Sequence, residues 1–291
     1  AVFEYVGNEP NIVFTEVYYN TLQNTETEWL EIHNNSNFAV DMSNWSIRFD
    51  KYDQTFTIPS GTVIEANKFM TFANDSTAMR ALHPDISIVG NLNIDFAKNK
   101  AVVTLRDSNN YPITSLTYSD QPLPRKADGY GYSYEYIAEL DSWRAPSLGG
   151  TPGIANNEGP SSDAHQKNPV INEINYASAE TIDADDWIEI YNPDNNEYDL
   201  SGWVMADKSG NIAIFPENGE CTIPSGGYLV VVKNAEKFHQ IHPNVACVQL
   251  DISLNSYIDG INLYDKYEFL RDSVYYSMFE KNWTKYAFGT G

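Results

Sequence analysis

The stretch from Pro169 to Trp203, PVINEINYASAETIDADDWIEIYNPDNNEYDLSGW, contains the pattern that decides the fold. Two short apolar runs, Val170–Tyr176 and Trp187–Tyr191, are separated by a polar loop. An Asn-Pro-Asp turn then leads into Asp-Leu-Ser-Gly-Trp. Apolar runs of this length, bounded by turn residues, indicate β-strands.

The same order of motifs occurs near the start of the chain, as IVFTEVYYN, then EWLEIHNN, then VDMSNW. The chain is therefore a tandem repeat, and its signature consists of acidic residues and tryptophans that recur in the same order. The matching positions are Glu16 and Glu173, Trp29 and Trp187, Glu31 and Glu189, Asp41 and Asp199, and Trp45 and Trp203.

Length and composition predict two all-β domains. A chain of 291 residues can bury two cores, and 42% hydrophobic with 13% aromatic residues indicates a globular protein. β-branched and aromatic residues are abundant, and apolar runs with helical spacing are almost absent. We expect domains at 1–156 and 168–291, joined by a polar linker at 157–167. Each has one short capped helix, Ser76–Leu82 or Ala235–Ile241.

The two copies differ at their ends. The second finishes with Ala287-Phe-Gly-Thr-Gly291, which aligns with Ala127-Asp-Gly-Tyr-Gly131 of the first. In the first copy the closing strand, predicted over Tyr130–Ile137, comes next. We therefore expect the second domain to lack its final strand. An unpaired edge of this kind invites pairing with another chain, so we also expect self-association through it.

These motifs resemble the lamin tail domain family, an immunoglobulin-like module named after nuclear lamins and also found in secreted bacterial proteins. The likeness rests on Ile-Asn-Glu-Ile, Asp-Trp-Ile-Glu-Ile-Tyr-Asn-Pro, Asp-Leu-Ser-Gly-Trp and Ile-Pro-Ser-Gly-Gly-Tyr-Leu-Val-Val, with Gly-Gly-Thr-Pro-Gly added in the first copy. The first copy departs from this pattern at Thr15 for Asn, Asn44 for Gly, and Asn67-Lys68 for Gly-Gly.

The resemblance implies two tandem β-sandwiches without catalytic activity. It suggests a binding, adhesive or spacer module of a larger secreted or surface protein. No heptad-patterned rod sequence is present, so the bacterial branch of the family is the closer likeness.

The net charge of −22 restricts the partners. Both halves are acidic and would repel a polyanion, so we expect no nucleic-acid binding. No apolar run approaches the length of about 18 residues that marks a membrane span, so we expect no membrane insertion. The chain begins at Ala1 without Met, which suggests a processed product whose signal segment is already absent. We expect an extracellular or bacterial cell-surface location, with a protein or glycan as partner.

The repeated glutamates allow a third function. Glu16 with Glu31, or Glu173 with Glu189, could be the two carboxylates of a glycoside hydrolase. The alternative is that each glutamate accepts hydrogen bonds from backbone N–H groups of a neighbouring loop. Duplication favours this structural role, because a reaction centre needs only one copy. We therefore expect no enzymatic activity.

Aromatic residues provide the candidate ligand surfaces. Trp29, Trp45, Trp187 and Trp203 are expected mainly in the core. Exposed tryptophans would instead suit a carbohydrate-binding module of a polysaccharide-degrading system, which is the alternative function. Aromatic residues that are not repeated are better candidates for a specific surface, because a scaffold need not duplicate them. These are Tyr130, Tyr132, Tyr134 and Tyr136.

Metal and thiol chemistry receive weak support. Asp183, Asp185 and Asp186 could supply oxygen ligands to calcium, but EF-hand spacing is absent, so a solvated loop is the preferred interpretation and no cofactor is expected. Cys221 and Cys247 form a bridge only if their strands are neighbours, which the sequence leaves open.

Overall fold

The computed structural model describes residues 9–23, 26–121, 126–159, 165–178, 182–277 and 279. The chain divides into two compact units, Ala1–Gly159 and Pro160–Gly291, and each is described by itself. The ending at Ala287–Gly291, to which the missing-strand prediction refers, lies outside the described residues.

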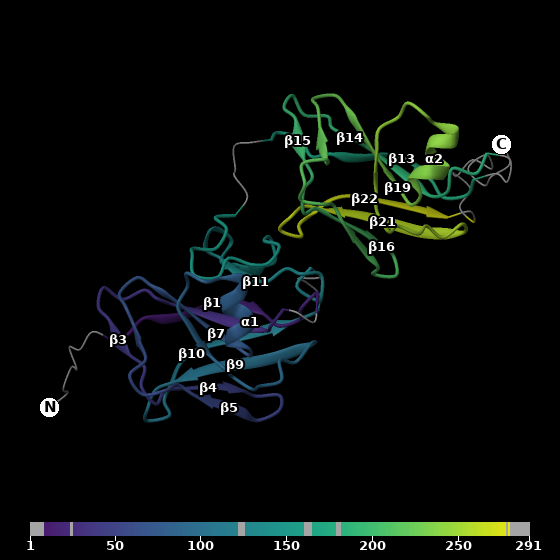
Figure 1. Ribbon diagram of the computed structural model, residues 1–291. Coiled ribbons are helices and arrows are strands. Elements are labelled where there is room, and N and C mark those ends of the chain that lie inside the picture. Colours follow the sequence, from purple (N-terminus) through teal and green to yellow (C-terminus); the bar gives the residue numbers. More distant parts are fainter. Residues whose placement is uncertain are drawn as a thin grey trace. The chain divides into compact units, whose positions relative to one another are not determined.

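The first unit is a sandwich of two main sheets (Figure 1). One has the order β12-β11-β1-β2-β7-β8 and the other β10-β9-β4-β5, while β3 and β6 form a small ribbon. The elements are β1 (Ile12–Tyr18), β2 (Trp29–Asn34), β3 (Val40–Asp41), β4 (Ser46–Phe49), β5 (Gln54–Thr57), β6 (Val63–Ile64), β7 (Phe69–Ala73), α1 (Ser76–Leu82), β8 (Ile88–Gly90), β9 (Lys100–Arg106), β10 (Pro112–Ser119), β11 (Tyr134–Ile137), η1 (Ala138–Leu140) and β12 (Ser142–Arg144).

The second unit repeats this order from β1 to β10. Its sheets are β13-β14-β19-β20 and β17-β16-β21-β22, with the ribbon β15-β18. The elements are β13 (Val170–Asn175), β14 (Trp187–Tyr191), β15 (Tyr198–Asp199), β16 (Val204–Asp207), β17 (Ile212–Ile214), β18 (Thr222–Ile223), β19 (Tyr228–Val232), α2 (Ala235–Ile241), β20 (Cys247–Gln249), β21 (Ile258–Tyr264) and β22 (Leu270–Ser277). Within the described residues, nothing corresponds to β11 and β12.

The predicted fold class is confirmed: the chain is mostly β, with one short α-helix in each half. Both helices have the predicted bounds, because their first N–H groups are capped. Asp75 accepts from the N–H groups of Thr77 and Ala78, and Asn234 accepts from that of Lys237. Each helix joins two parallel strands, a connection that a tight turn cannot make.

The closing strand is shorter than predicted. β11 covers only Tyr134–Ile137, and a further strand, β12, pairs with it through Tyr136 and Trp143. The chain before β11 has turns and a single bridge from Tyr132 to Leu148. Glycines with positive φ at 129 and 131 interrupt the extended backbone there.

The departures from the repeat pattern preserve backbone shape. Asn44 has φ of 61° where the second copy has Gly202 at 70°, and Asn67 has φ of 55° where it has Gly226 at 66°. Asparagine tolerates the left-handed region better than other residues with a side chain. The same turns therefore form in both units.

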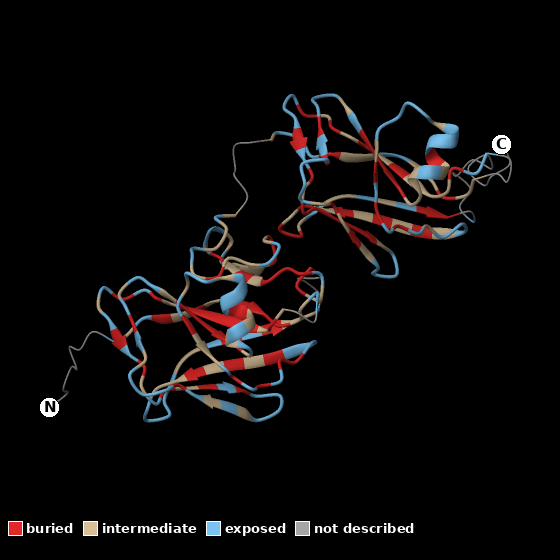
Figure 2. Ribbon diagram, viewed as in Figure 1, coloured by how far each residue is buried: buried red, intermediate tan, exposed pale blue. Residues whose placement is uncertain are grey.

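A stacked tyrosine pair recurs in both cores. Figure 2 shows in red the buried stretches of the strands of both units. Tyr19 stacks on Tyr118 at 4.6 Å between ring centroids, and Tyr176 stacks on Tyr276 at 4.1 Å. In each unit one tyrosine directly follows β1 or β13, and the other lies on β10 or β22. The pair therefore links the two sheets.

A buried asparagine holds the same corner in each unit. The side-chain amide of Asn192 donates to the carbonyls of Asn196, Ile223 and Pro224. Asn34 makes the equivalent bonds in the first unit. The bonds to Ile64 and Ile223 are buried and the others partly buried, so the amide compensates these carbonyls for the water they lose on folding.

Replacing this asparagine tests the corner. We expect Asn192→Ala to lower the free energy of unfolding of the second unit by about 1–3 kcal/mol, because buried carbonyls lose their donor. Asn195→Ala, at an exposed site in the same loop, should stay within about 0.5 kcal/mol. Urea unfolding measures both, and equal effects would contradict this role.

Candidate functional site

The repeated glutamates lie opposite each other on neighbouring strands. Glu16 on β1 pairs with Glu31 on β2, and Glu173 on β13 pairs with Glu189 on β14. A bulge just before the first glutamate recurs in both units. Directly paired side chains point to the same face of a sheet, so each unit presents two adjacent carboxylates on its outer face.

In the first unit, the segment 147–157 closes over these carboxylates. The N–H of Thr151 donates to Glu16 Oε1 at 2.8 Å, and its hydroxyl donates to Oε2 at 3.1 Å. The N–H of Gly153 donates to Glu31 Oε2 at 2.6 Å. Both glutamates are fully buried, with charge-assisted hydrogen bonds in place of water.

A third carboxylate joins this cluster from β11. Glu135 pairs with Glu16 across the strands and is also fully buried. It accepts from the Ser133 hydroxyl at 3.2 Å and from the N–H of Asn157 at 3.4 Å. The Asn156 amide donates to the carbonyls of Thr15 and Tyr136, so the loop is fastened to β1 and β11 together.

Burial, and to a smaller extent the crowding of acidic groups, raises the pKa values of this cluster. Burial, and then the charges of Glu135 and Glu31, raise the pKa of Glu16 well above its ordinary value. Burial raises the pKa of Glu31 to about 7, against the lowering effect of hydrogen bonds from Gly153, Thr15 and Thr71. Burial also raises the pKa of Glu135. The cluster therefore carries less negative charge at neutral pH than three free carboxylates would.

Gly150 lets the segment approach this closely. Its φ is +79°, and a Cβ there would stand 2.4 Å from Glu16 Oε1 and 2.9 Å from Trp29 Cζ2. Trp29 is almost completely buried beneath the loop. The neighbouring Gly149 also has a positive φ, of +78°, but a Cβ there would meet open space. The second glycine of the Gly-Gly-Thr-Pro-Gly motif therefore allows the loop to lie directly against the carboxylates, because it has no side chain.

In the second unit, none of the described residues covers the same face as segment 147–157 does in the first. Glu173 is exposed and Glu189 half-buried, and Asn172 takes the place of Thr15 by donating to Glu189 Oε1 at 2.7 Å. Trp187 is half-buried. Tyr191 and Tyr228 lie together at 4.9 Å between ring centroids, with Tyr228 55% exposed. We call Glu173, Trp187, Glu189, Tyr191 and Tyr228 the open face.

The other signature residues are structural. Asp41 accepts from the N–H and hydroxyl of Ser43, and Asp199 makes the same two bonds with Ser201. These bonds set the turn that enters β4 or β16. Trp45 and Trp203 follow these turns and are buried.

The four tyrosines proposed as a ligand surface do not form one surface. Tyr130 is 42% exposed, whereas Tyr132 is buried. Tyr134 and Tyr136 are half-buried and pack against Trp143, with ring centroids 5.2 and 5.9 Å away. The rings tilt against one another and do not present a flat platform.

The acidic loop, whose aspartates are weak candidates for calcium, lies beside two lysines. Lys237 Nζ lies 2.7 Å from Asp183 and 3.4 Å from Asp185, and Lys233 Nζ lies 3.9 Å from Asp186. The described residues contain no group of three or more His, Cys, Asp or Glu side chains arranged for a metal ion. Cys221 and Cys247 are both free thiols.

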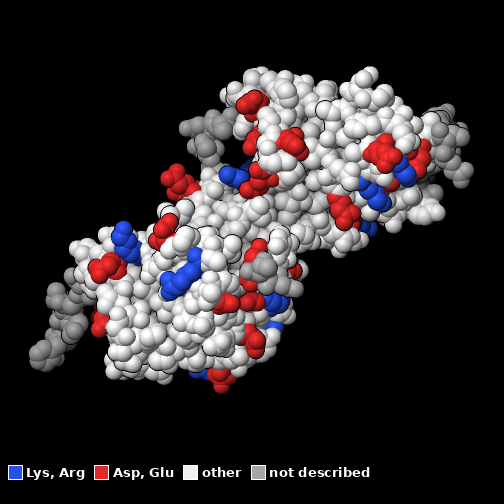
Figure 3. All heavy atoms as spheres, viewed as in Figure 1, with Lys and Arg blue, Asp and Glu red and all other residues white. Residues whose placement is uncertain are grey.

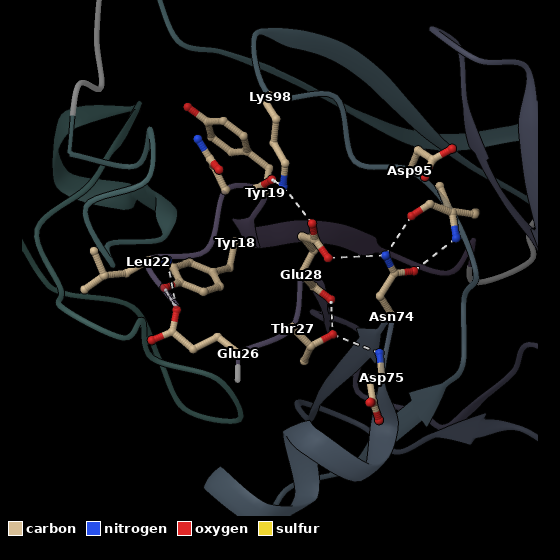
Figure 4. Close-up of polar contacts among 12 residues, drawn as sticks. Tyr18, Tyr19, Leu22, Glu26, Thr27, Glu28, Asn74, Asp75, Asp95 and Lys98 are labelled. Carbon is tan, nitrogen blue, oxygen red and sulfur yellow. Dashed lines mark hydrogen bonds and ion pairs between the residues drawn. The ribbon is translucent and has the colours of Figure 1, made fainter. Parts of the chain in front are cut away.

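Sequence reasoning missed a polar network at one end of the first unit, shown in Figure 4. Lys98 Nζ lies 2.6 Å from Glu28 Oε1 and also donates to the Tyr19 carbonyl. The Asn74 amide donates to Glu28 and to the carbonyl of Ile94. Burial would raise the pKa of Glu28, but the Lys98 hydrogen bond and charge hold it below the ordinary value. Three loops separated in sequence are joined here, and no local pattern in the sequence indicates it.

Two hollows on the surface lie away from the glutamates. One is lined by side chains that include Ile188, Met205 and Ile261, and the other by residues 50–51 and 99–102. Neither includes a carboxylate of the repeated pairs. Among the described residues, none of the helices has the length and apolar content needed to cross a membrane.

Two sandwiches of the same topology, sharing one glutamate pair and one corner asparagine, define a tandem immunoglobulin-like β protein. The Lamin Tail Domain family matches residues 6–120 and 162–277, and the chain belongs to this family. Both matches leave out β11, β12 and the Gly-Gly-Thr-Pro-Gly segment.

The comparisons with individual proteins add little. No curated protein matches the chain. One solved structure, from a study of inhibition of the exo-beta-D-glucosaminidase CsxA, matches 89% of this chain and 26% of that chain, at 8% identity and a TM-score of 0.21. The chain thus spans about a quarter of that enzyme's length, and a likeness this weak supports no argument about function.

Gly150 and Gly149 form a matched pair for testing the closed segment. We expect Gly150→Ala to destabilise the first unit by about 3 kcal/mol or more, because its Cβ would displace Glu16 and Trp29. Gly149→Ala should cost only about 1 kcal/mol, from its left-handed backbone. Urea unfolding of the two variants compares them, and equal losses would show that the segment does not press on the carboxylates.

The buried cluster also predicts a pH dependence. Because the folded pKa of Glu31 is about 7 and its ordinary value is 4.5, the folded protein retains a proton that the unfolded chain releases between these values. Stability should therefore fall as pH rises from 4.5 to 7, by up to about 1.4 kcal/mol per pH unit from this residue. The difference in unfolding free energy between the wild type and Glu31→Gln isolates the effect. A difference that stays constant across this window would contradict it.

Proposed function

We propose that the chain is a non-catalytic binding or spacer module of a secreted or cell-surface bacterial protein. This proposal rests on the burial and the hydrogen bonds of the glutamate pair in the first unit. Glu16 and Glu31 are completely buried and accept N–H and hydroxyl bonds from the closing segment. Carboxylates held in this way stabilise a fold, since a substrate has no access to them.

The open face supports binding rather than a purely mechanical role. It places two carboxylates beside aromatic side chains on a regular sheet, where strand geometry fixes their positions. Scattered exposed residues would need no explanation, but carboxylates and aromatic rings gathered on one sheet face fit a binding surface.

Surface charge favours a neutral or basic partner. Figure 3 shows acidic side chains spread over the visible face, with lysines and arginines scattered between them. The net charge of −22 makes nucleic acid an unsuitable partner. A protein or a glycan suits this surface better, and an acidic surface also favours solubility outside the cell.

Carbohydrate binding is a second candidate, because the open face contains exposed aromatic rings next to carboxylates. Sugar rings stack on aromatic side chains, and carboxylate oxygens accept hydrogen bonds from sugar hydroxyls. Tyr228 is the most exposed ring of this face and would carry most of the stacking.

The hydrolase alternative is tested by activity. We expect the full chain to release no product above the buffer control from a panel of chromogenic glycosides, at any pH from 4 to 8. The Glu173→Gln/Glu189→Gln variant serves as the control. Turnover by the wild type that this variant lacks would refute the non-catalytic assignment.

The carbohydrate alternative is tested by a glycan array followed by titration calorimetry on any positive glycan. If it holds, Tyr228→Ala should weaken binding about tenfold, since one stacking contact is lost. Tyr111→Ala is the matched control, because Tyr111 is 69% exposed and belongs to the first unit, whereas the open face belongs to the second. An array without positives, or equal effects of the two variants, would remove this alternative.

A further inference from the structure

The apolar hollow of the second unit lies between its two sheets. It has a volume of about 30 Å³ and is lined by residues of β14, β16, β17 and β21 and by the segment 251–254. Its wall includes Ile188, Met205 and Ile261, which belong to the core. Glu189 follows Ile188 on β14 and therefore points to the opposite face of that strand. The hollow is thus separate from the open face.

Three phenylalanines of the first unit correspond to smaller residues at this hollow. The aligned pairs are Phe49 and Asp207, Phe56 and Ala213, and Phe96 and Leu254. Strand register supports the alignment. Phe56 pairs with Ile47. Ala213 pairs in the same way with Met205, the counterpart of Ile47. All three smaller residues line the hollow.

In the first unit these rings fill the space between the sheets. Phe49 and Phe96 are almost completely buried, with 4.8 Å between their ring centroids. Phe56 points to the same face as its partner Ile47, which is fully buried. The second unit keeps an aliphatic wall around this position but has lost the rings. The hollow is therefore the space that replacement of large side chains by smaller ones leaves in a core.

A polar link across this space also differs between the units. In the first unit, the Gln54 side chain accepts the N–H of Asp95 at 2.9 Å and donates to Asp95 Oδ2 at 3.3 Å. This link fastens β5 to the segment that contains Phe96. The counterpart of Gln54 is Asn211, which instead donates its N–H and its side-chain amide to Asp207, at 2.9 and 2.6 Å. Asn211 lines the hollow.

Two carboxylates also line the hollow and set its charge. Asp207 is half-buried and Asp251 is exposed. Their counterparts in the first unit, Phe49 and Asn93, are uncharged. The lining residues that the structure describes include neither lysine nor arginine. Since charges attract more strongly near a poorly solvated surface, the hollow favours a positively charged ligand over a negatively charged one.

The volume restricts the ligand to a single ring. An apolar cavity that takes up benzene in another protein measures about 150 Å³, which is several times larger than this hollow. A ring therefore enters only part of the way, by its edge. Its substituent then remains at the carboxylates.

We propose that this hollow binds the ring of a small aromatic cation of the arylalkylamine class. The ring takes the place of the first unit's phenylalanines and contacts Met205, Ile261 and Leu254. The ammonium group lies beside Asp207 and Asp251. This inference goes beyond the proposed function, because it adds a small-molecule site at a place separate from the open face.

The experiment uses the full chain with isotope-labelled isoleucine and methionine methyl groups, and benzylamine at pH 7 as the probe. The ring current of benzylamine should shift the methyl resonances of Ile188, Met205 and Ile261, with a dissociation constant on the order of 1 mM. The methyl resonance of Ile47 in the first unit should not move, because phenylalanine rings already fill the corresponding space.

Two further ligands separate the effect of the ring from that of the charge. Benzoate has the same ring with a negative charge, and butylamine has the positive charge without a ring. Each should bind at least tenfold more weakly than benzylamine. Equal binding of benzoate would contradict the role of the carboxylates, and equal binding of butylamine would contradict the role of the ring. Either result would overturn the proposal.

Variants of the chain test the same contacts. Leu254→Phe restores the ring that Phe96 provides in the first unit, so it should weaken benzylamine binding at least tenfold. Asp251→Asn changes an exposed residue and leaves the core intact, and it should weaken binding about threefold. Glu197→Gln is the matched control, because it removes one charge at an exposed residue that does not line the hollow. It should bind as the wild type does.

Urea unfolding checks that each variant is folded, and Asp251→Asn decides the matter if Leu254→Phe is not. The proposal is overturned by unshifted methyl resonances at the hollow, by undiminished binding to folded Leu254→Phe, or by equal binding to Asp251→Asn and Glu197→Gln. Loss of benzylamine binding in Tyr228→Ala would assign the amine to the open face. None of these results affects the non-catalytic assignment, which the glycoside assays test.

Discussion

The first unit depends on an exchange of water for backbone N–H groups at its buried carboxylates. Glu16 and Glu31 lie under a loop that contributes the donors of Thr151 and Gly153. Removing ionisable groups from water is costly, and only good hydrogen-bond geometry compensates for it. This constraint explains why the loop contains glycine at 150, and why it lies so close to the sheet.

The two copies show what this exchange contributes. β2 is buried on both faces, whereas β14 alternates between buried and half-buried residues, as expected of a sheet with one open side. The strands themselves are alike, down to the bulge before the glutamate. In the first unit the closing segment turns the outer face of the sheet into an interior, whereas no described residue covers the corresponding face of the second unit in this way.

The sequence was sufficient for the architecture because repetition gave each motif a second, independent occurrence. The strands of the repeated motif and both helices follow from local patterns, which depend on neighbours in the chain. The burial of the site residues was harder to predict from the sequence. Glu16 and Glu173 read identically in sequence, yet one is buried and the other exposed, because the difference arises from a loop more than a hundred positions away. Likewise, the alternating tyrosines suggested one surface, but bridging and packing on Trp143 divided them.

The ion pair between Glu28 and Lys98 at the end of the first unit is arranged differently in the second unit. Glu28 receives Lys98 from the loop before β9, whereas its counterpart Asp186 lies near Lys233, at the position that Asn74 occupies in the first unit. The acidic residue thus occupies the same place in both units, while the lysine near it comes from a different loop in each. Engineers who recombine such repeats would need to transfer interacting loops together, treating each domain end as one inherited unit.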